Sequence, residues 1–175
     1  MRTVPVSLGG VTYHLLLNGA ALFDLYDRFG DRGSLADHLQ GSGRDAFENT
    51  CFFLEKLAEQ GELWRRYQGY DHGPLPEAEA FRVGLTPMEA VLARKAVVEA
   101  LAAGFAQEET EKPGTVDKGL LALQKNGGEI KRGAYLDAAA GFLGLGLREA
   151  LLLPVGLVLD LVELKIRRLG GRKKE

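Results

Sequence analysis

The sequence predicts a mainly α-helical protein in which an N-terminal β-hairpin packs on a small helical domain, followed by a linker and a small C-terminal helical unit. Three observations support this class. Two short β-type runs flank Gly9-Gly10, a helix start is encoded at 86–89, and apolar residues recur at helical spacing through most of the remaining chain. The 175 residues are 46% apolar and 26% charged, which is enough to bury a core.

The N-terminal hairpin is predicted from residues 3–8 and 11–17, which are rich in β-forming side chains. The glycine pair between them tolerates the positive φ angles of a tight turn. Pro5 cannot donate a ladder hydrogen bond, so we expect an edge strand or an irregular one at that position. Because two strands alone are only marginally stable in water, the hairpin must pack on helices.

Three helical segments are predicted between the hairpin and residue 60. Residues 20–29 form the first and stop at Gly30, and residues 35–40 form a short second piece. Residues 44–60 form the third, which Gly61 interrupts. Its predicted buried face comprises Phe47, Cys51, Leu54, Leu57 and Ala58. We interpret Cys51 as a small buried hydrophobic residue, because no base that would activate it is evident nearby.

Phe52 points almost opposite this face. Either a second side of the helix is covered, or Phe52 belongs to a partner-binding patch. Trp64 and Tyr67 follow beside Arg65 and Arg66. Core aromatics with a solvated arginine pair explain this cluster better than a site that stacks nucleic-acid bases, which needs more aromatic residues.

Residues 85–107 are predicted to form the central helix. Thr86 can cap the helix, Pro87 tolerates the first helical position, and Glu89 can return a hydrogen bond to the cap. The broad apolar arc of this helix is expected to be buried in the core, and it comprises Met88, Val91, Leu92, Val98, Leu101 and Phe105.

The domain boundaries follow from a change in composition. We predict an N-terminal domain over residues 1–107, a flexible linker over 108–132 and a C-terminal unit over 133–175. The linker is charged and then broken by Pro113-Gly114 and Gly127-Gly128. The C-terminal unit is predicted to form helices at 134–143, 147–153 and 155–169, the last opened by Pro154 and followed by a basic tail.

The last of these helices has too much apolar surface for so small a unit. Asp160, Glu163 and Arg167 form one polar stripe, and apolar side chains occupy most of the remaining circumference. A unit of this size cannot bury such an arc alone, so it must dock on the N-terminal domain, self-associate or hold another protein. The candidate protein-binding residues are Phe52, Leu147, Leu151, Val155, Val158, Leu161 and Val162.

Composition and motifs exclude several other functions. A net charge of −2 argues against nucleic acid, and one cysteine with three scattered histidines provides no metal site. The apolar run between Glu149 and Asp160 is too short to span a membrane. The N-terminus resembles no secretion signal, so we expect an intracellular protein. Because no catalytic or cofactor motif is present either, we predict a binding protein and not an enzyme.

The sequence resembles the tail assembly chaperones of long-tailed, siphovirus-type bacteriophages. In the N-terminal part the similarity rests on the hairpin around Gly9-Gly10, Tyr13, Leu15, Leu17, Ala20-Ala21-Leu22, Leu25 and Phe29-Gly30. In the C-terminal part it rests on 141–145, Glu149-Ala150, Pro154-Val155-Gly156-Leu157 and Asp160-Leu161. This second group is similar to the extension of the longer of two such chaperones, which a programmed ribosomal frameshift appends.

The resemblance implies a chaperone in the host cytoplasm that is absent from the mature virion. Its expected client is the tape measure protein, and the extension adds tail tube protein as a second expected partner. Two alternatives stay open. One is a helical adaptor or regulator that self-associates through residues 155–169. The other is a nucleic-acid-associated protein that uses Arg65, Arg66 and the tail from Arg167 to Lys174.

Overall fold

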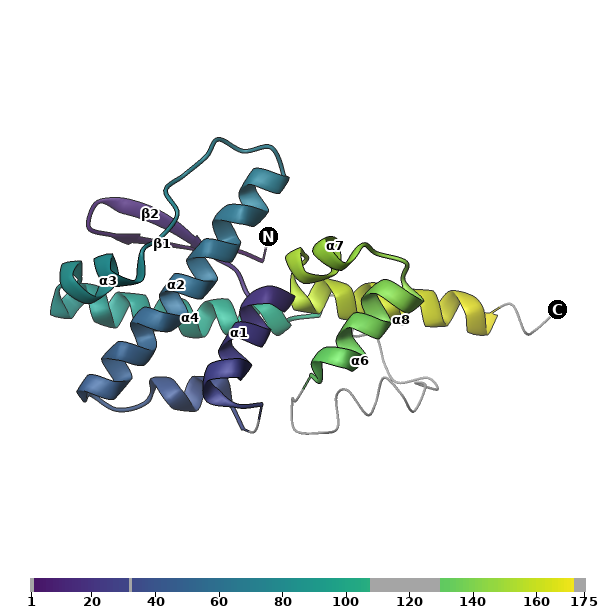
Figure 1. The fold of residues 1–175 in the computed structure, drawn as a ribbon, viewed down its shortest axis with the longest axis horizontal. Helices are drawn as coiled ribbons and strands as arrows, with labels where there is room; N and C mark the ends of the chain where they lie inside the picture. The colour runs from purple at the N-terminus through teal and green to yellow at the C-terminus, as the bar shows by residue number, and fades with distance from the viewer. Residues whose placement is uncertain (1, 32, 108–129, 172–175) are drawn as a thin grey trace.

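The computed structural model describes residues 2–31, 33–107 and 130–171, and it has the mainly helical class that the sequence predicts (Figure 1). The elements, in chain order, are β1 (Val4–Leu8), β2 (Val11–Leu15), α1 (Gly19–Phe29), the 3-10 helix η1 (Leu35–Leu39), α2 (Arg44–Tyr67), α3 (Ala78–Gly84), α4 (Pro87–Phe105), α6 (Arg132–Leu136), the π-helical segment η2 (Asp137–Phe142), α7 (Leu147–Leu152) and α8 (Val155–Gly171).

The predicted N-terminal hairpin is confirmed. β1 and β2 pair antiparallel, with Val4 opposite Leu15 and Leu8 opposite Val11. Gly9 and Gly10 make the turn at φ values of 57° and 77°. Pro5 lies opposite His14 in this two-stranded sheet, where each strand has an open edge. The hairpin packs against α2 and α4, so the helices supply the support that two strands need.

The prediction that Gly61 interrupts the third helix is wrong, because α2 runs through it to Tyr67. The glycine has a different role. The end of β2 crosses α2 here, and a Cβ atom on Gly61 would lie 1.6 Å from the carbonyl oxygen of His14. One residue beyond β2, the Leu16 amide donates to the Leu57 carbonyl over 3.0 Å. Gly61 therefore permits contact between strand backbone and helix backbone.

The start of α4 is the predicted capping box. Thr86 Oγ1 accepts from the Glu89 amide at 3.3 Å, and the Thr86 amide donates to Glu89 Oε2 at 2.9 Å. The Gly9 amide also donates to Glu89 Oε1, at 2.7 Å. One carboxylate thus ties the hairpin turn to the beginning of the central helix.

These hydrogen bonds predict a pH dependence. The Gly9 amide and then the Thr86 groups lower the pKa of Glu89 from its ordinary 4.5. The stability that this carboxylate adds is therefore complete above about pH 4.5 and is lost as the pH falls through the lowered pKa. We expect the free-energy difference between wild type and Glu89→Gln, from urea denaturation, to shrink over that range. A difference that is the same at neutral and acidic pH would contradict the role of the carboxylate.

The predicted buried face of α4 is largely wrong. Its buried residues are Ala93, Ala96, Val97, Ala100, Leu101 and Gly104, so Leu101 alone is shared with the predicted set, and Phe105 is half-buried. Small side chains face inward because the chain after β2 lies very close. A Cβ atom on Gly104 would stand 2.3 Å from Leu17 Cβ. Close packing favours small side chains at this contact, and four larger apolar residues of α4, Met88, Val91, Leu92 and Val98, lie outside.

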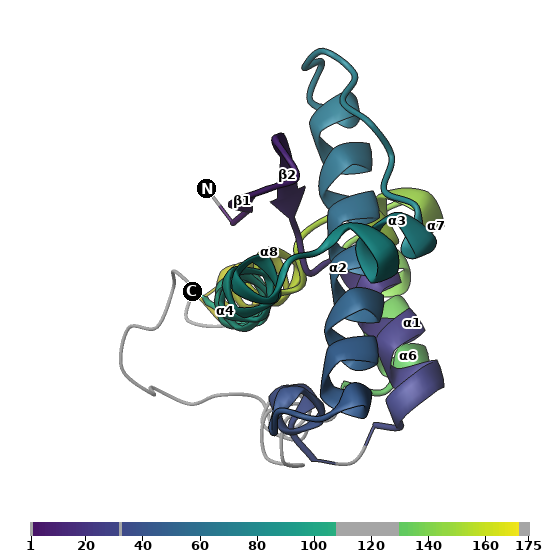
Figure 2. The ribbon, with the colours of Figure 1, turned by 90° about the vertical axis from the view of Figure 1, so that its left-hand side faces the viewer.

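The C-terminal helices dock on the N-terminal domain and share its core. Asn18 caps α1 and donates from Nδ2 to Gln60 Oε1 at 3.0 Å and to the Leu152 carbonyl at 3.2 Å. The Val155 amide donates to the Leu17 carbonyl. α8 continues along the line of α4, so the two helices overlap when that line is viewed end-on (Figures 1 and 2).

Two further predictions about the C-terminal half need correction. The linker was predicted to extend to residue 132, but Ile130 is buried and α6 begins at Arg132; residues 108–129 lie outside the described chain. The polar stripe of α8 is also incomplete. Glu163 and Arg167 form the expected pair at 2.5 Å, whereas Asp160 is buried and pairs with Arg2.

Candidate protein-binding surfaces

Three of the seven candidate binding residues are buried by the chain itself. Val155 and Val158 are 0% exposed and Val162 is 4% exposed. They form the inner side of α8, which packs against the end of α4 and against η2. In this conformation they therefore offer no surface to a partner, and the docking of the C-terminal unit accounts for them.

Phe52 packs at the edge of the core and is half-buried. Its ring meets the edge of Phe29 at 5.9 Å between centroids, and the Arg28 guanidinium lies 4.2 Å from the ring centroid. Lys56 lies over the same ring at 5.7 Å. Of the two explanations for Phe52, this arrangement favours the covered second side of the helix.

The other three candidates lie at or near the surface. Leu147 is 62% exposed at the start of α7, and Leu151 is half-buried one turn later. Leu161 is half-buried on the outer side of α8. Leu151 and Leu161 each line a hollow of the surface, and these hollows are the places where a partner could be held.

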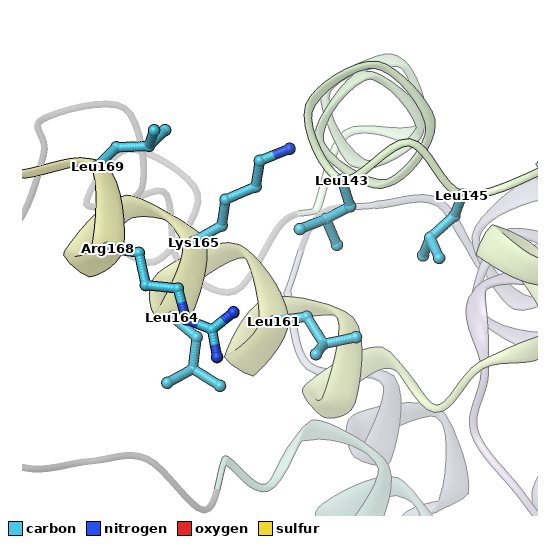
Figure 3. Close-up of a pocket in the computed structure, with 7 residues that line it drawn as sticks. All are labelled: Leu143, Leu145, Leu161, Leu164, Lys165, Arg168 and Leu169. Carbon is cyan, nitrogen blue, oxygen red and sulfur yellow. The ribbon is translucent and has the colours of Figure 1, made fainter.

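The larger hollow, which we call the α8 groove, has a volume of about 690 Å³ (Figure 3). It lies between α8 and the segment that follows η2. Its lining combines five leucines with two cationic side chains: Leu143, Leu145, Leu161, Leu164, Leu169, Lys165 and Arg168. Lys165 Nζ donates to the Phe142 carbonyl and lies 4.8 Å from the centre of the Phe142 ring. The groove is thus apolar with a positive rim.

A π-helical turn builds one wall of this groove. In η2 the hydrogen bonds span one residue more than in an α-helix, as between the Leu143 amide and the Ala138 carbonyl at 3.0 Å. Gly144 then reverses the chain at a φ of 78°. Leu143 and Leu145, on either side of this turn, face α8. Such π-helical turns occur frequently at functional sites.

A second hollow, of about 500 Å³, lies between the end of α2 and α7. Its lining mixes apolar, aromatic and cationic side chains: Ala20, Gln60, Leu63, Arg66, Tyr67, Arg148, Leu151 and Leu152. A small hollow of about 110 Å³ joins the two, because Leu145 and Leu152 both line it. The three hollows therefore lie next to one another between α8 and the end of α2, with Glu149, Arg66 and Arg148 among the lining residues.

The aromatic residues at the end of α2 are not core residues, contrary to the interpretation from sequence. Tyr67 is 57% exposed and stacks on Trp64 with ring centres 5.7 Å apart. Neither arginine is simply solvated, because Glu62 pairs with Arg66 at 2.9 Å and with Arg65 at 3.8 Å. This carboxylate offsets part of the positive charge that the nucleic-acid alternative places at Arg65 and Arg66.

Cys51 has the predicted character of a small buried hydrophobic residue. Its side chain is 1% exposed, and burial, followed by the charge of Glu48, raises the pKa of the thiol to about 11. The thiol is therefore protonated at neutral pH, and the reactive thiolate is suppressed.

A second apolar surface, which we call the α4 face, was not predicted from the sequence. Four large residues of α4 project into solvent: Met88 at 70%, Val91 at 64%, Leu92 at 47% and Val98 at 42% exposed. Lys95 and Glu99 lie among them, and Val83 of α3 is 86% exposed close to the start of the helix. The second arc of α4, in which Ala93, Ala96, Ala100 and Gly104 accompany Val97 and Leu101, was the signal that this helix buries its side with the smaller residues.

Within the described ranges, no helix is long and apolar enough to cross a membrane, and no group of three or more histidine, cysteine or acidic side chains is arranged to hold a metal ion. No protein-family model matches the chain, and no curated protein or solved structure gives a significant match to it.

Proposed function

We propose that this protein is a tail assembly chaperone of a long-tailed bacteriophage, in its longer, frameshift-extended form. In this proposal it binds the tape measure protein during tail tube assembly and is absent from the mature virion. The observation that supports a client-binding role is the α8 groove, in which five leucines remain only partly covered after the C-terminal helices have docked. The phage assignment itself rests on the sequence resemblance.

The lining of the groove favours an amphipathic helix as the bound element. The apolar face of such a helix can be buried against Leu143, Leu161 and Leu164, as happens in apolar grooves of other proteins. Lys165 and Arg168 on the rim favour acidic residues beside that face. A long helical protein with an exposed apolar stripe, which aggregates unless it is covered, is a client of this description.

A self-associating adaptor is the second candidate, and the α4 face is the observation that favours it. Four large apolar side chains on one exposed helix are an unusual feature for a protein that acts alone. The buried state of Val155 and Val158 argues against the alternative in which residues 155–169 form the dimer contact. The two functions are compatible, because the α8 groove and the α4 face share no residue.

The test is affinity capture of the tagged full-length protein from lysing, phage-producing cells, followed by mass spectrometry. We expect wild type to recover a very long, helix-rich protein and a small tube-forming one. Leu161→Asp should reduce recovery about tenfold or more, because a charge in a desolvated contact costs roughly 2 kcal/mol or more.

The matched control is Leu75→Asp, which places the same charge at a leucine that is 47% exposed and outside the groove. This variant should recover the client as wild type does. Equal loss with both variants, or recovery of the bait alone by wild type, would contradict the chaperone proposal.

A further inference from the structure

The exposed side of α4 has the spacing of a helix-packing seam. Met88, Leu92, Lys95, Glu99, Ala102 and Ala106 follow one another at alternate steps of four and three residues, as in the seam between two packed helices. All six are exposed, and Val91 and Val98 flank them on one side. Ala106 is the C-cap residue just beyond α4, and its carbonyl accepts from Arg2 and lies close to Gly156 of α8, but its side chain is exposed like the other five.

Size along this seam is distributed unevenly. Its first half carries the large side chains Met88 and Leu92, whereas its second half carries Ala102 and Ala106. When an antiparallel copy is laid on this exposed side about a two-fold axis at the level of residue 97 along the helix, Met88 falls opposite Ala106 of the copy and Leu92 opposite Ala102. Large residues facing small ones let two helices approach closely and interdigitate.

The same two-fold axis places opposite charges of the two chains against each other. Lys95 of one chain falls opposite Glu99 of the other, and the pair occurs twice because the contact is symmetric. Within one chain these two side chains are 3.8 Å apart and 74% and 52% exposed, so both can reach a neighbouring helix. Parallel pairing would instead place Lys95 beside Lys95 and Glu99 beside Glu99.

We propose that the occupant of the α4 face is a second copy of this chain, bound in an antiparallel, two-fold symmetric contact. This contact is independent of the proposed chaperone function. It would hold for an adaptor equally well, and a client in the α8 groove does not require it.

Charge exchange tests the contact on the full-length protein, with sedimentation equilibrium as the measurement. Wild type should dimerise. Lys95→Glu and Glu99→Lys should each weaken the dimer about tenfold or more, because each places like charges opposite one another twice. The double variant Lys95→Glu, Glu99→Lys should recover dimerisation, since both symmetric pairs are restored with opposite polarity.

Mixing the two single variants provides a second readout. Each is expected to be mainly monomeric alone, whereas the mixture should form a heterodimer in which every facing pair is attractive. Leu75→Asp, which places a charge at an exposed leucine between α2 and α3, should leave dimerisation unchanged, and Leu92→Asp should abolish it. A monomeric wild type, or a dimer that Leu92→Asp does not affect, would overturn the proposal.

A dimer that the double exchange does not restore would likewise overturn the antiparallel register. If wild type were monomeric and the Leu92→Asp variant no longer bound the client, the α4 face would be a client-binding surface and the proposed self-contact would be wrong. None of these outcomes depends on whether a client binds in the α8 groove, so failure of this inference and failure of the chaperone proposal are distinguishable.

Discussion

A Gly61→Ala variant is expected to be strongly destabilised, at or above the top of the roughly 1–3 kcal/mol range typical of overpacking. The added Cβ would lie 1.6 Å from the oxygen and 2.6 Å from the carbon of the His14 carbonyl. These are backbone atoms, so no rotamer change relieves the clash and the hairpin must move off α2. Urea denaturation followed by circular dichroism measures the loss.

Gly133→Ala is the control for this variant. Gly133 also lies in a helix, but no atom stands within 4 Å of the position that its Cβ would take. There the substitution should be neutral or should stabilise by up to about 1 kcal/mol, because alanine restricts the unfolded chain. If both variants had the same midpoint, the close crossing of β2 over α2 would be wrong.

Asp160→Ala is expected to cost about 3–5 kcal/mol, because it removes one partner of a buried ion pair. The Arg2 and Asp160 side chains are only 11% and 5% exposed, and they are 2.6 Å apart. Arg2 also donates to the Ala106 carbonyl at 2.7 Å, so this side chain joins the N-terminus, the end of α4 and α8. We expect faster proteolysis of the C-terminal helices as well as a lower unfolding free energy.

Arg167→Ala is the comparison, because Arg167 pairs with Glu163 on the same helix and is 42% exposed. Its removal should cost at most about 0.5 kcal/mol. A double-mutant cycle of Arg2→Ala and Asp160→Ala should give a large coupling energy. Additive effects of the two changes would show that the pair does not hold the C-terminal helices in place.

Local signals in the sequence were sufficient to predict where most helices and strands begin and end. The Gly9-Gly10 turn, the capping box at Thr86 and the proline that precedes α8 each act within a few residues of themselves. Such features depend on short-range hydrogen bonding and backbone restriction, which a single sequence reports directly.

The buried side of α4 could not be predicted in this way, because two arcs of the helix are apolar. Hydrophobicity alone favours the arc with Met88 and Leu92, whereas the structure buries the arc with Ala96, Ala100 and Gly104. The close approach of Leu17 to Gly104 decides which arc is buried, and Leu17 is far from α4 in the sequence. Gly61 was misinterpreted for the same reason, since its partner His14 belongs to another element.

The candidate binding site was predicted only in part. The surplus apolar surface expected on the C-terminal unit is present in the structure as the α8 groove, which Leu161 lines, and a bound partner there stays a prediction. It could not divide α8 into a docked side and an open side, because that division depends on the contacts of Val155 and Val158 with the N-terminal domain. Asp160 gave no signal that its partner is Arg2, at the opposite end of the chain.

The most direct test of the central claim, that the α8 groove holds the client, is a calorimetric titration of the full-length protein with purified tape measure protein. We expect saturable binding by wild type and by Leu92→Asp, and binding that is about tenfold or more weaker for the double variant Leu161→Asp, Leu164→Asp. Circular dichroism would verify that this variant keeps its helicity. Equal affinity of the groove variant and wild type, or no binding by wild type, would contradict the claim.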